Sequence, residues 1–343
     1  MKRFFQYLIA FILIIFIFPT ILTKHKEIAT SSNEEVVVNE IIPKIKLLHT
    51  KTNEVEEVPL EEYICNVVSG EMPADYEIEA LKAQAIVART YTIYKMQHKK
   101  HDNADICDSS SCCQAWISKE DRLSKWDEDK REEYWNKIEK CVNETKGKII
   151  TYNNEPINAF FHANSGGSTE TPKDVWGGDN YPYLQVVQTA GEEGYKQYSS
   201  EVSFTFEELT TKLKEKYSDI KIDFDNNDDL KVLEYTGSGR VKTVKFGNHE
   251  LSGVETRTLL GLKSSNFELV KSNGKVSFQV KGYGHGVGMS QTGADSMAKE
   301  GKTAEEIIKH FYTDVEILPM VPGLVGNNYH PNPQPLAISW TNL

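Results

Sequence analysis

The spacing of apolar residues predicts a chain that mixes helices and strands. The strongest helical pattern covers residues 76–97, where so few positions are polar that we expect a buried helix. A second helical pattern, PLEEYICNVVSGE, precedes it at residues 59–71. Upstream, residues 45–59 alternate as two strands and predict a hairpin that turns at Thr52 and Asn53.

The second half of the chain carries weaker patterns of both kinds. Residues 147–164 predict two strands joined at an Asn-Asn turn. A charge-rich stretch follows, with a helix at 204–217 and strands at 231–236 and 240–246. After residue 275 the pattern gives a strand, a glycine-rich loop and two short helices. The expected fold class is therefore α+β, a mixed core domain with an inserted smaller α/β lobe. The expected segments are a core at 45–200 and 266–322, the lobe at 201–265, and a C-terminal tail at 323–343.

The N-terminus predicts a membrane anchor. The run from Phe4 to Leu22 is almost entirely apolar, and at about 1.5 Å per helical residue it can span a hydrocarbon core of about 30 Å. No small-x-small cleavage site follows, which favours an uncleaved signal anchor at 1–23 over a cleaved signal peptide. A polar linker at 24–44 would tether the core. We expect a single-pass protein of the cell membrane whose core lies outside the cytoplasm.

Charge narrows the range of partners. The 343 residues carry a formal net charge of −11. Nucleic acids and anionic lipid surfaces attract clustered Lys and Arg, so neither is expected as the main partner.

The segment around Glu71 carries the most distinctive chemistry. Glu71 lies between Gly70 and a Met-Pro pair, directly ahead of the buried helix. On that helix, Lys82 and Arg89 are seven residues apart and share one stripe. Cations on such a helix need carboxylates, carbonyls or a wet groove, so structural ion pairs and a substrate-binding role both remain open. Glu71 itself has a plain structural alternative, which is to favour the N-terminal end of a helix dipole.

The glycine-rich loop near the C-terminus does not match a nucleotide site. GYGHGVGMSQTG lacks the Lys-Ser/Thr pair of a phosphate loop and misses the dinucleotide spacing. Alternating glycines let a backbone pass close to a helix or to a sugar ring. His285, Ser290 and Gln291 would then bind a saccharide, or would only satisfy a tight loop. Ser165, in HANSGGSTE, has the same two interpretations.

A cysteine cluster follows the buried helix. His101, Cys107, Cys112 and Cys113 match a closed structural zinc site with three Cys ligands and one His. Disulfides are the default outside the cytoplasm, but the five cysteines are odd in number and adjacent cysteines pair poorly. Zinc, a disulfide and free thiols therefore stay open, with His98 as a substitute ligand.

Four motifs in order resemble one family. GEMP, ALKAQAIVARTY, FFHANSGGSTET with DVWGG, and GYGHGVGMSQTGADSMAKEG resemble the SpoIID (stage II sporulation protein D) family of peptidoglycan lytic transglycosylases over about residues 45–320. The resemblance implies that Glu71 is the catalytic acid and base, and that the core is a catalytic domain. It also implies zinc at the His and Cys cluster, as in clostridial members. The expected substrate is peptidoglycan glycan strands stripped of stem peptides. The expected role is engulfment during sporulation, in the engulfing membrane of the mother cell, with the stage II sporulation proteins P and M as partners.

Other functions remain open at this stage. A two-carboxylate glycoside hydrolase would need a second acid about 5–9 Å from Glu71, with Glu170 and Asp174 as candidates. A non-catalytic, membrane-anchored glycan-binding scaffold would use the same groove. A zinc hydrolase fits least well, because four protein ligands leave no open position on the metal.

Overall fold

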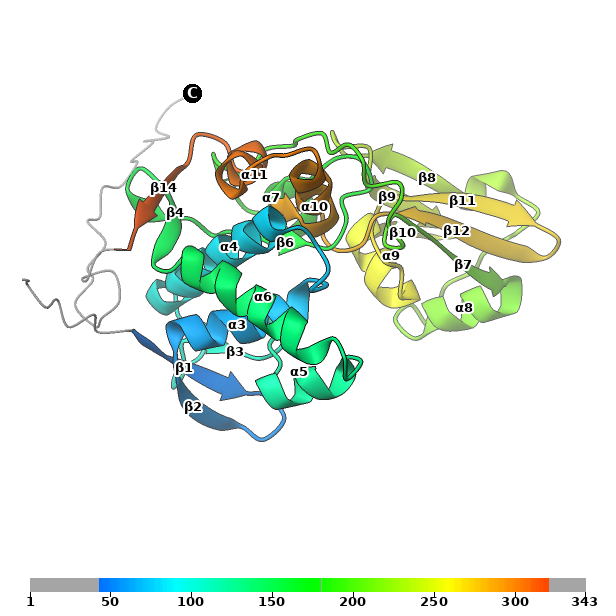
Figure 1. Ribbon diagram of the computed structural model, residues 1–343. Coiled ribbons are helices and arrows are strands. Elements are labelled where there is room, and N and C mark those ends of the chain that lie inside the picture. The colour runs from blue at the N-terminus through cyan, green and yellow to red at the C-terminus, as the bar shows by residue number, and fades with distance from the viewer. Residues whose placement is uncertain (1–42, 180, 321–343) are drawn as a thin grey trace, which may run out of the picture. The chain divides into compact units, whose positions relative to one another are not determined.

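The computed structural model describes residues 43–179 and 181–320 (Figure 1). The predicted anchor at 1–23, nearly all of the predicted linker and the predicted tail lie outside these residues. Within the described ranges, no helix is both long enough and apolar enough to cross a membrane. The fold is mixed α and β, as expected, with two hydrophobic cores. We call residues 43–198 and 282–320 the first lobe, and residues 199–281 the second lobe.

The first lobe is built around helices. Its helices are α3 (Leu60–Glu71), α4 (Ile78–Gln97), α5 (Lys119–Lys125), α6 (Arg131–Glu144), α7 (Pro172–Trp176), α10 (Gln291–Lys299) and α11 (Ala304–Phe311). Its strands are β1 (Lys44–His49), β2 (Glu54–Pro59), β3 (Ile106–Cys107), β4 (Lys148–Tyr152), β5 (Glu155–Pro156), β6 (Phe161–His162), β13 (Met289–Ser290) and β14 (Glu316–Pro319). The strands form three small sheets with the orders β2-β1-β3, β14-β4-β5 and β13-β6. Both predicted turns are confirmed, because Asn53, Asn153 and Asn154 adopt positive φ between antiparallel strands.

Helix α4 is the centre of the first lobe. Every residue from 83 to 93 is buried, which confirms the expected buried helix. The helix packs against α3, α6, α10, α11 and β4, so its neighbours cover it on several sides. Two of its polar side chains, Thr90 and Thr92, donate to carbonyls one turn back at 2.7 and 2.8 Å, which removes the cost of burying them.

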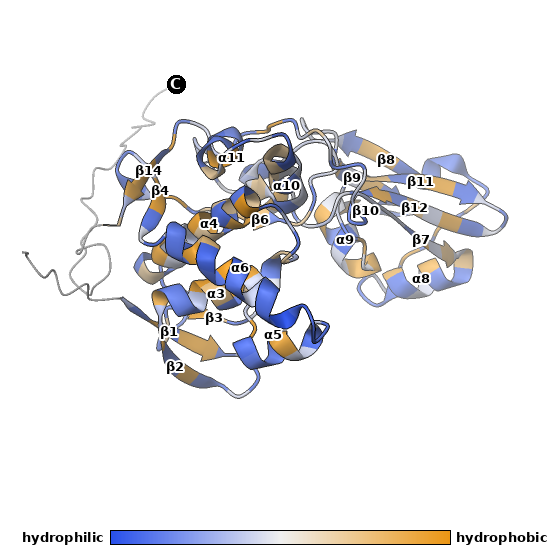
Figure 2. Cartoon of the chain, in the orientation of Figure 1, coloured by the Kyte–Doolittle hydropathy of each residue, from blue (hydrophilic) through white to orange (hydrophobic). Residues whose placement is uncertain are grey.

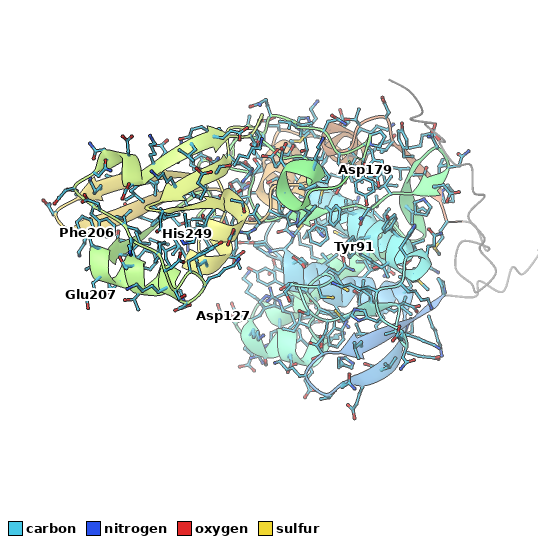
Figure 3. All side chains as sticks on the ribbon, turned by 180° about the vertical axis from the view of Figure 1, so that it is seen from behind. Tyr91, Asp127, Asp179, Phe206, Glu207 and His249 are labelled. Atoms are coloured by element: carbon cyan, nitrogen blue, oxygen red, sulfur yellow. The ribbon has the colours of Figure 1, made fainter. Side chains whose placement is uncertain are left out.

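The second lobe is a pair of antiparallel sheets with two helices. Its elements are β7 (Ser199–Thr205), α8 (Phe206–Lys214), the short 3-10 helix η2 (Asn227–Asp229), β8 (Leu230–Tyr235), β9 (Val241–Phe246), β10 (His249–Ser252), α9 (Gly253–Leu260), β11 (Phe267–Ser272) and β12 (Lys275–Lys281). The sheet orders are β10-β9-β8 and β11-β12-β7. Along β12, buried Val276, Phe278 and Val280 alternate with more exposed residues, and Figure 2 shows the same alternation as colour. Figure 3 shows the chain from behind, with Phe206 and His249 in this lobe.

The core of the second lobe extends beyond the predicted insertion. It includes residues of β11 and β12, which the sequence analysis assigned to the second part of the core domain. The sequence pattern does not reveal this, because β12 pairs with β7 from the far end of the lobe and only the folded chain brings them together.

The glycine-rich loop returns the chain to the first lobe along the segment 160–166. Gly282, Gly284, Gly286 and Gly288 all have positive φ. A methyl group added at Gly288 would lie 1.9 Å from the Phe160 carbonyl oxygen, so no larger residue fits there without a shift of the backbone. The glycines therefore allow close approach, but their neighbours are segment 160–166 and, at Gly286, the Arg240 side chain, instead of the predicted helix or sugar ring.

Candidate active site

Glu71 is the last residue of α3. Pro73 excludes a helical conformation for the residue before it, and Met72 is extended with φ −121° and ψ 144°. The helix therefore stops at Glu71. This position rules out a role at the N-terminal end of a helix dipole, since the C-terminal end carries partial negative charge and disfavours an ionised carboxylate.

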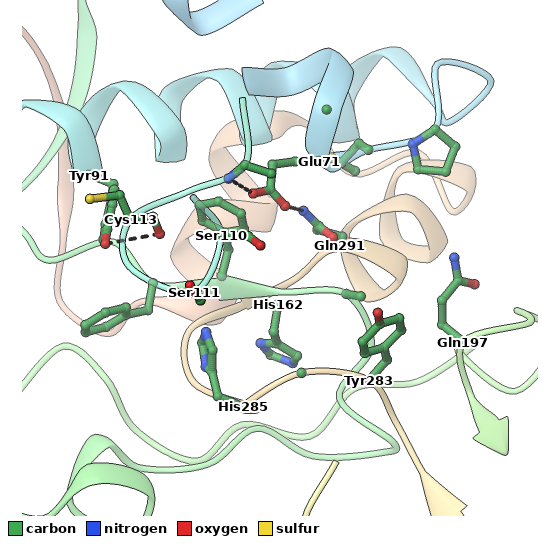
Figure 4. A pocket seen from close by; sticks show the side chains of 18 of the residues that line it. Glu71, Tyr91, Ser110, Ser111, Cys113, His162, Gln197, Tyr283, His285 and Gln291 are labelled. Atoms are coloured by element: carbon green, nitrogen blue, oxygen red, sulfur yellow. Dashed lines mark hydrogen bonds between the residues drawn. The ribbon is translucent and has the colours of Figure 1, made fainter. Parts of the chain in front are cut away.

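Glu71 lines a cavity of about 970 Å³ (Figure 4). The wall includes segments far apart in sequence: the α3–α4 connection, the loop at 110–115, segment 160–163 and the glycine-rich loop. Figure 4 shows Glu71 on one side of the cavity and Tyr283, His162 and His285 on the other. Eight aromatic residues line it: Tyr76, Tyr91, Trp126, Tyr134, Phe160, Phe161, Trp176 and Tyr283. The volume suits a small chain of sugar rings, whose apolar C–H faces pack on aromatic rings.

The Glu71 carboxyl is half-buried and weakly solvated. Its Oε1 accepts a hydrogen bond from the Ala115 backbone N–H at 2.6 Å, and Gln291 Nε2 approaches Oε2 at 3.5 Å. Burial raises the pKa of Glu71, and these two donors offset that effect only in part. A carboxyl with a raised pKa can hold a proton near neutral pH and deliver it to a ligand in the cavity.

The loop that carries Ala115 lies against residue 70, where there is room for a methyl group but not for a long side chain. A methyl group at Gly70 would lie 3.4 Å from Ile117 Cγ2 and 3.7 Å from the Ala115 carbonyl oxygen. A longer side chain at residue 70 would push this loop away, and the hydrogen bond to Glu71 would lengthen.

Only one other carboxylate among the described residues lines the cavity. It is Asp75, which is exposed to solvent. Glu170 is 1% exposed and accepts hydrogen bonds from the Thr236 and Ser238 hydroxyls at 2.6 and 2.5 Å. Asp174 lies in the first turn of α7. Neither expected second acid therefore reaches the cavity.

The structure places Lys82 and Arg89 in ion pairs instead of in the cavity. Arg89 has no exposed side-chain surface, and its guanidinium donates to Glu61 at 2.5–3.2 Å and to the Lys148 carbonyl oxygen at 3.2 Å. Lys82 pairs with Glu79 and Glu144 at 2.9 and 2.7 Å. This differs from the expectation that they bind substrate. The physical reason is that both point into the packing between α4 and its neighbours.

Ser165 and Ser290 are also away from the cavity. Both are fully buried, and their hydroxyls donate to the buried carboxylate of Glu192, as does Thr189. Burial raises the pKa of Glu192, but these hydrogen bonds outweigh it and lower the pKa overall. The serines thus satisfy a buried anion that joins two loops, which matches the structural alternative of the sequence analysis.

His285 and Gln291 do line the cavity. The ring of His285 lies 5.0 Å from Trp176 and 6.0 Å from Phe160, and its Nδ1 accepts the Val287 N–H at 3.0 Å. Burial lowers the pKa of His285 well below its usual value, so the ring is neutral. The neutral ring therefore forms part of the aromatic wall and carries no charge.

The exposed aromatic residues of the cavity were not predicted from the sequence. Trp176 and Tyr283 are 50% and 40% exposed and line it together. Both lie inside motifs quoted above, DVWGG and GYGHGVG, so an exposed aromatic within a glycine-rich motif was the available signal.

The predicted metal ligands come together beside the cavity. The ligand atoms of His101, Cys107, Cys112 and Cys113 all lie within 4.8 Å of one another. Two Sγ–Sγ separations are 3.4 and 3.8 Å, and two Sγ–Nε2 separations are 3.6 and 3.7 Å. A tetrahedral ion with Zn–S of about 2.3 Å and Zn–N of about 2.0 Å needs separations of about 3.5–3.8 Å, so the geometry fits.

The remaining cysteine and histidine candidates lie elsewhere. None of the five cysteines is joined in a disulfide in this structure. The alternative ligand His98 stacks on Tyr94 and contacts the Tyr94 carbonyl oxygen through Nδ1.

Comparisons with known proteins show the family of this chain. Residues 48–152 match the family described as Stage II sporulation protein, SpoIID. Stage II sporulation protein D of Bacillus subtilis is 36% identical over 276 residues, which cover 80% of this chain and 78% of the relative. The chain belongs to the stage II sporulation protein D family. The same protein of Bacillus amyloliquefaciens is 33% identical over 84% of this chain and 83% of the relative.

Two further matches are a second family model and a relative of lower identity. Residues 186–288, which include the second lobe, match a domain of unknown function, DUF8618. A Bacillus subtilis protein named amidase enhancer is 28% identical over 72% of this chain and 39% of the relative. Membership of the family assigns this chain a role in sporulation.

Proposed function

We propose that this chain is a membrane-anchored peptidoglycan lytic transglycosylase. It cleaves the MurNAc–GlcNAc bonds of peptide-stripped glycan strands and leaves 1,6-anhydroMurNAc ends during engulfment. The observation that carries this proposal is a half-buried carboxyl with a raised pKa, Glu71, in an aromatic-lined cavity where the other lining carboxylate among the described residues, Asp75, is solvent-exposed.

The reaction needs only one protein carboxyl. Glu71 donates its proton to the glycosidic oxygen, and the bond from that oxygen to the anomeric carbon breaks as positive charge develops on the sugar. The 6-hydroxyl of the same sugar then bonds to the anomeric carbon and returns its proton to Glu71. The acid is regenerated and no water is consumed. Ala115 donates to Oε1 at 2.6 Å, whereas Gln291 is 3.5 Å from Oε2, so Oε2 is the less firmly hydrogen-bonded oxygen and the one we assign the transferable proton.

Product analysis tests this proposal. Peptide-free glycan strands are incubated with the full chain and the products are analysed by mass spectrometry. We expect ends lighter by one water than a reducing end. Glu71→Gln should abolish cleavage while retaining binding and a native melting profile. Reducing ends from the unmodified protein would refute the transglycosylase mechanism.

Asp75→Asn is the matched control, because Asp75 is the other carboxylate in the cavity wall. A two-carboxylate hydrolase loses its activity in both variants and releases reducing ends. A transglycosylase with one carboxyl keeps most of its activity in Asp75→Asn. A glycan-binding scaffold would bind strands in every variant and cleave none.

We propose that this protein binds a structural zinc ion. His101, Cys107, Cys112 and Cys113 would hold it, and a closed four-ligand ion contributes folding energy and no chemistry to the substrate. Support comes from the tetrahedral separations given above. Metal analysis of the purified chain should find one zinc per molecule, and Cys107→Ser should lose it. A chain that folds and melts identically with and without zinc would contradict this role.

We propose the location and partners from the family and the sequence. The apolar run ahead of residue 23 would hold the catalytic core outside the cytoplasm, and the stage II sporulation proteins P and M would be its partners. Membrane fractionation of the full chain, and of a chain that begins at residue 24, tests the anchor. Co-purification from sporulating cells tests the partners.

A further inference from the structure

Three cations line the cavity without a carboxylate partner. They are Lys95 on α4, Arg122 on α5 and Arg257 on α9. Each is half-buried, and among the described residues none forms a hydrogen bond or an ion pair through its charged group. Lys95 and Arg122 lie over aromatic rings, with the cation 5.0 Å from the centre of Tyr91 and 4.7 Å from that of Trp126.

Arg257 is the most exceptional of the three. It comes from the second lobe and reaches the cavity beside Tyr283 of the first lobe. Burial lowers the pKa of its guanidinium, and no neighbouring carboxylate opposes that effect. Arg240, which is nearby and fully buried, donates instead to the Ser165 and Ser168 carbonyl oxygens at 2.6 and 3.2 Å.

This arrangement is costly unless an anion completes it. A partly desolvated guanidinium loses hydration that only a carboxylate, a phosphate or carbonyl oxygens can replace. The chain has a net charge of −11, so acidic partners are abundant elsewhere on its surface. Glu71 and Asp75 line the same cavity, but among the described residues no carboxylate pairs with Arg257, Arg122 or Lys95.

The chemistry of the glycan supplies a matching anion. Each MurNAc carries a lactyl group whose carboxyl is an amide, and so neutral, while a stem peptide is attached. Hydrolysis of that amide leaves a free carboxylate on every second sugar of the strand.

We propose that Arg257, with Arg122 and Lys95, binds the free lactyl carboxylates of the glycan and so selects strands from which the stem peptide has been removed. This inference rests on the proposed function for the identity of the glycan. Arg257 is then a specificity residue that the second lobe contributes to the cavity.

A binding experiment separates this inference from the proposed function. The full chain with Glu71→Gln is titrated with amidase-stripped glycan strands and with the same strands after their carboxylates are coupled to methylamine. We expect stripped strands to bind about tenfold to a hundredfold more tightly than the methylamide strands, the range for charged hydrogen bonds. Adding Arg257→Gln should weaken binding of stripped strands by about the same factor and change binding of methylamide strands little.

Two further variants keep the experiment decisive. Lys242→Gln is the matched control, because Lys242 is an exposed cation of the same lobe that pairs with Glu234 outside the cavity. Arg122→Gln repeats the test if Arg257→Gln does not show a native melting curve. Equal affinity for the two polymers, or an equal loss for both on substitution, would overturn the inference. Binding is measured without turnover, so a chain that cleaves nothing still gives a clear result here.

Discussion

Replacing Arg89 with methionine should destabilise the protein without touching the cavity. The Arg89 side chain has no exposed surface, and its donors reach both oxygens of Glu61 as well as three backbone carbonyl oxygens. Methionine fills much of the same volume but removes the positive charge. The Glu61 carboxylate, which is only 15% exposed, would then lie buried with no cation beside it.

The expected loss is large because one partner of a buried pair remains. Removing one member of such a pair costs about 3–5 kcal/mol of the free energy of unfolding. Lys82→Met is the matched control, since Lys82 lies on the same stripe of α4 and its ion pairs with Glu79 and Glu144 are partly exposed. That substitution should cost about 1 kcal/mol or less.

Urea unfolding, followed by tryptophan fluorescence, measures the loss of unfolding free energy in the first lobe. Four of the five tryptophans, Trp116, Trp126, Trp135 and Trp176, lie in the first lobe, and residues 199–281 contain none. The fifth, Trp340, lies outside the described residues and is replaced by phenylalanine (Trp340→Phe) in every protein compared. The signal therefore reports the lobe that contains α4, even if the two lobes unfold separately. An Arg89→Met variant with wild-type stability and weakened glycan binding would refute the structural assignment and restore a groove role for this residue.

Four further predictions follow from the site. Glu71→Gln should be at least as stable as the unmodified chain at pH 7, because a raised folded pKa means that ionisation of Glu71 costs stability above its unfolded pKa; in thermal melts the advantage should vanish below about pH 4.3. Gln291→Leu removes a donor that lowers the pKa of Glu71, so the alkaline limb of the cleavage rate against pH should move to higher pH. Cys112→Ser, or chelation of bound metal, should loosen the loop that carries Ala115, with a lower kcat and a lower melting temperature. Gly288→Ala should reduce soluble expression or thermal stability severely, because its Cβ would overlap the backbone at 160–166.

Local features of the chain were predictable because neighbours in sequence decide them. The buried helix α4 follows from its apolar perimeter, and the turns at Asn53 and Asn153 follow from residues that tolerate positive φ. The position of Glu71 at a helix end follows from Pro73, which is two residues away. The clustering of the His and Cys side chains was predictable because His101 and Cys113 are only twelve residues apart in the chain.

Long-range pairings were not predictable from one sequence. The carboxylate that neutralises Arg89 comes from α3. The anion that accepts hydrogen bonds from Ser165 and Ser290 is Glu192, which belongs to none of the four motifs. Nothing in the periodicity of α9 indicates that Arg257 reaches a cavity formed mainly by the other lobe. Such contacts depend on how the two lobes pack against each other through segment 160–166 and the glycine-rich loop.

One loop of the first lobe links the cysteine cluster to the candidate acid. The pKa of Glu71 depends on the Ala115 N–H, and Ala115 is two residues beyond Cys113 on a loop without regular structure. A loop free to move would withdraw the Ala115 donor, which lowers the pKa of Glu71, and would admit water, which weakens the larger effect of burial, so the pKa would no longer be fixed by this contact. Under the zinc proposal, an ion shared by Cys112, Cys113, His101 and Cys107 would tie this loop to the end of α4 and to β3, which pairs with β1. A family member that lacks the cluster must hold the loop by other contacts, and its acid should then be less sensitive to chelators.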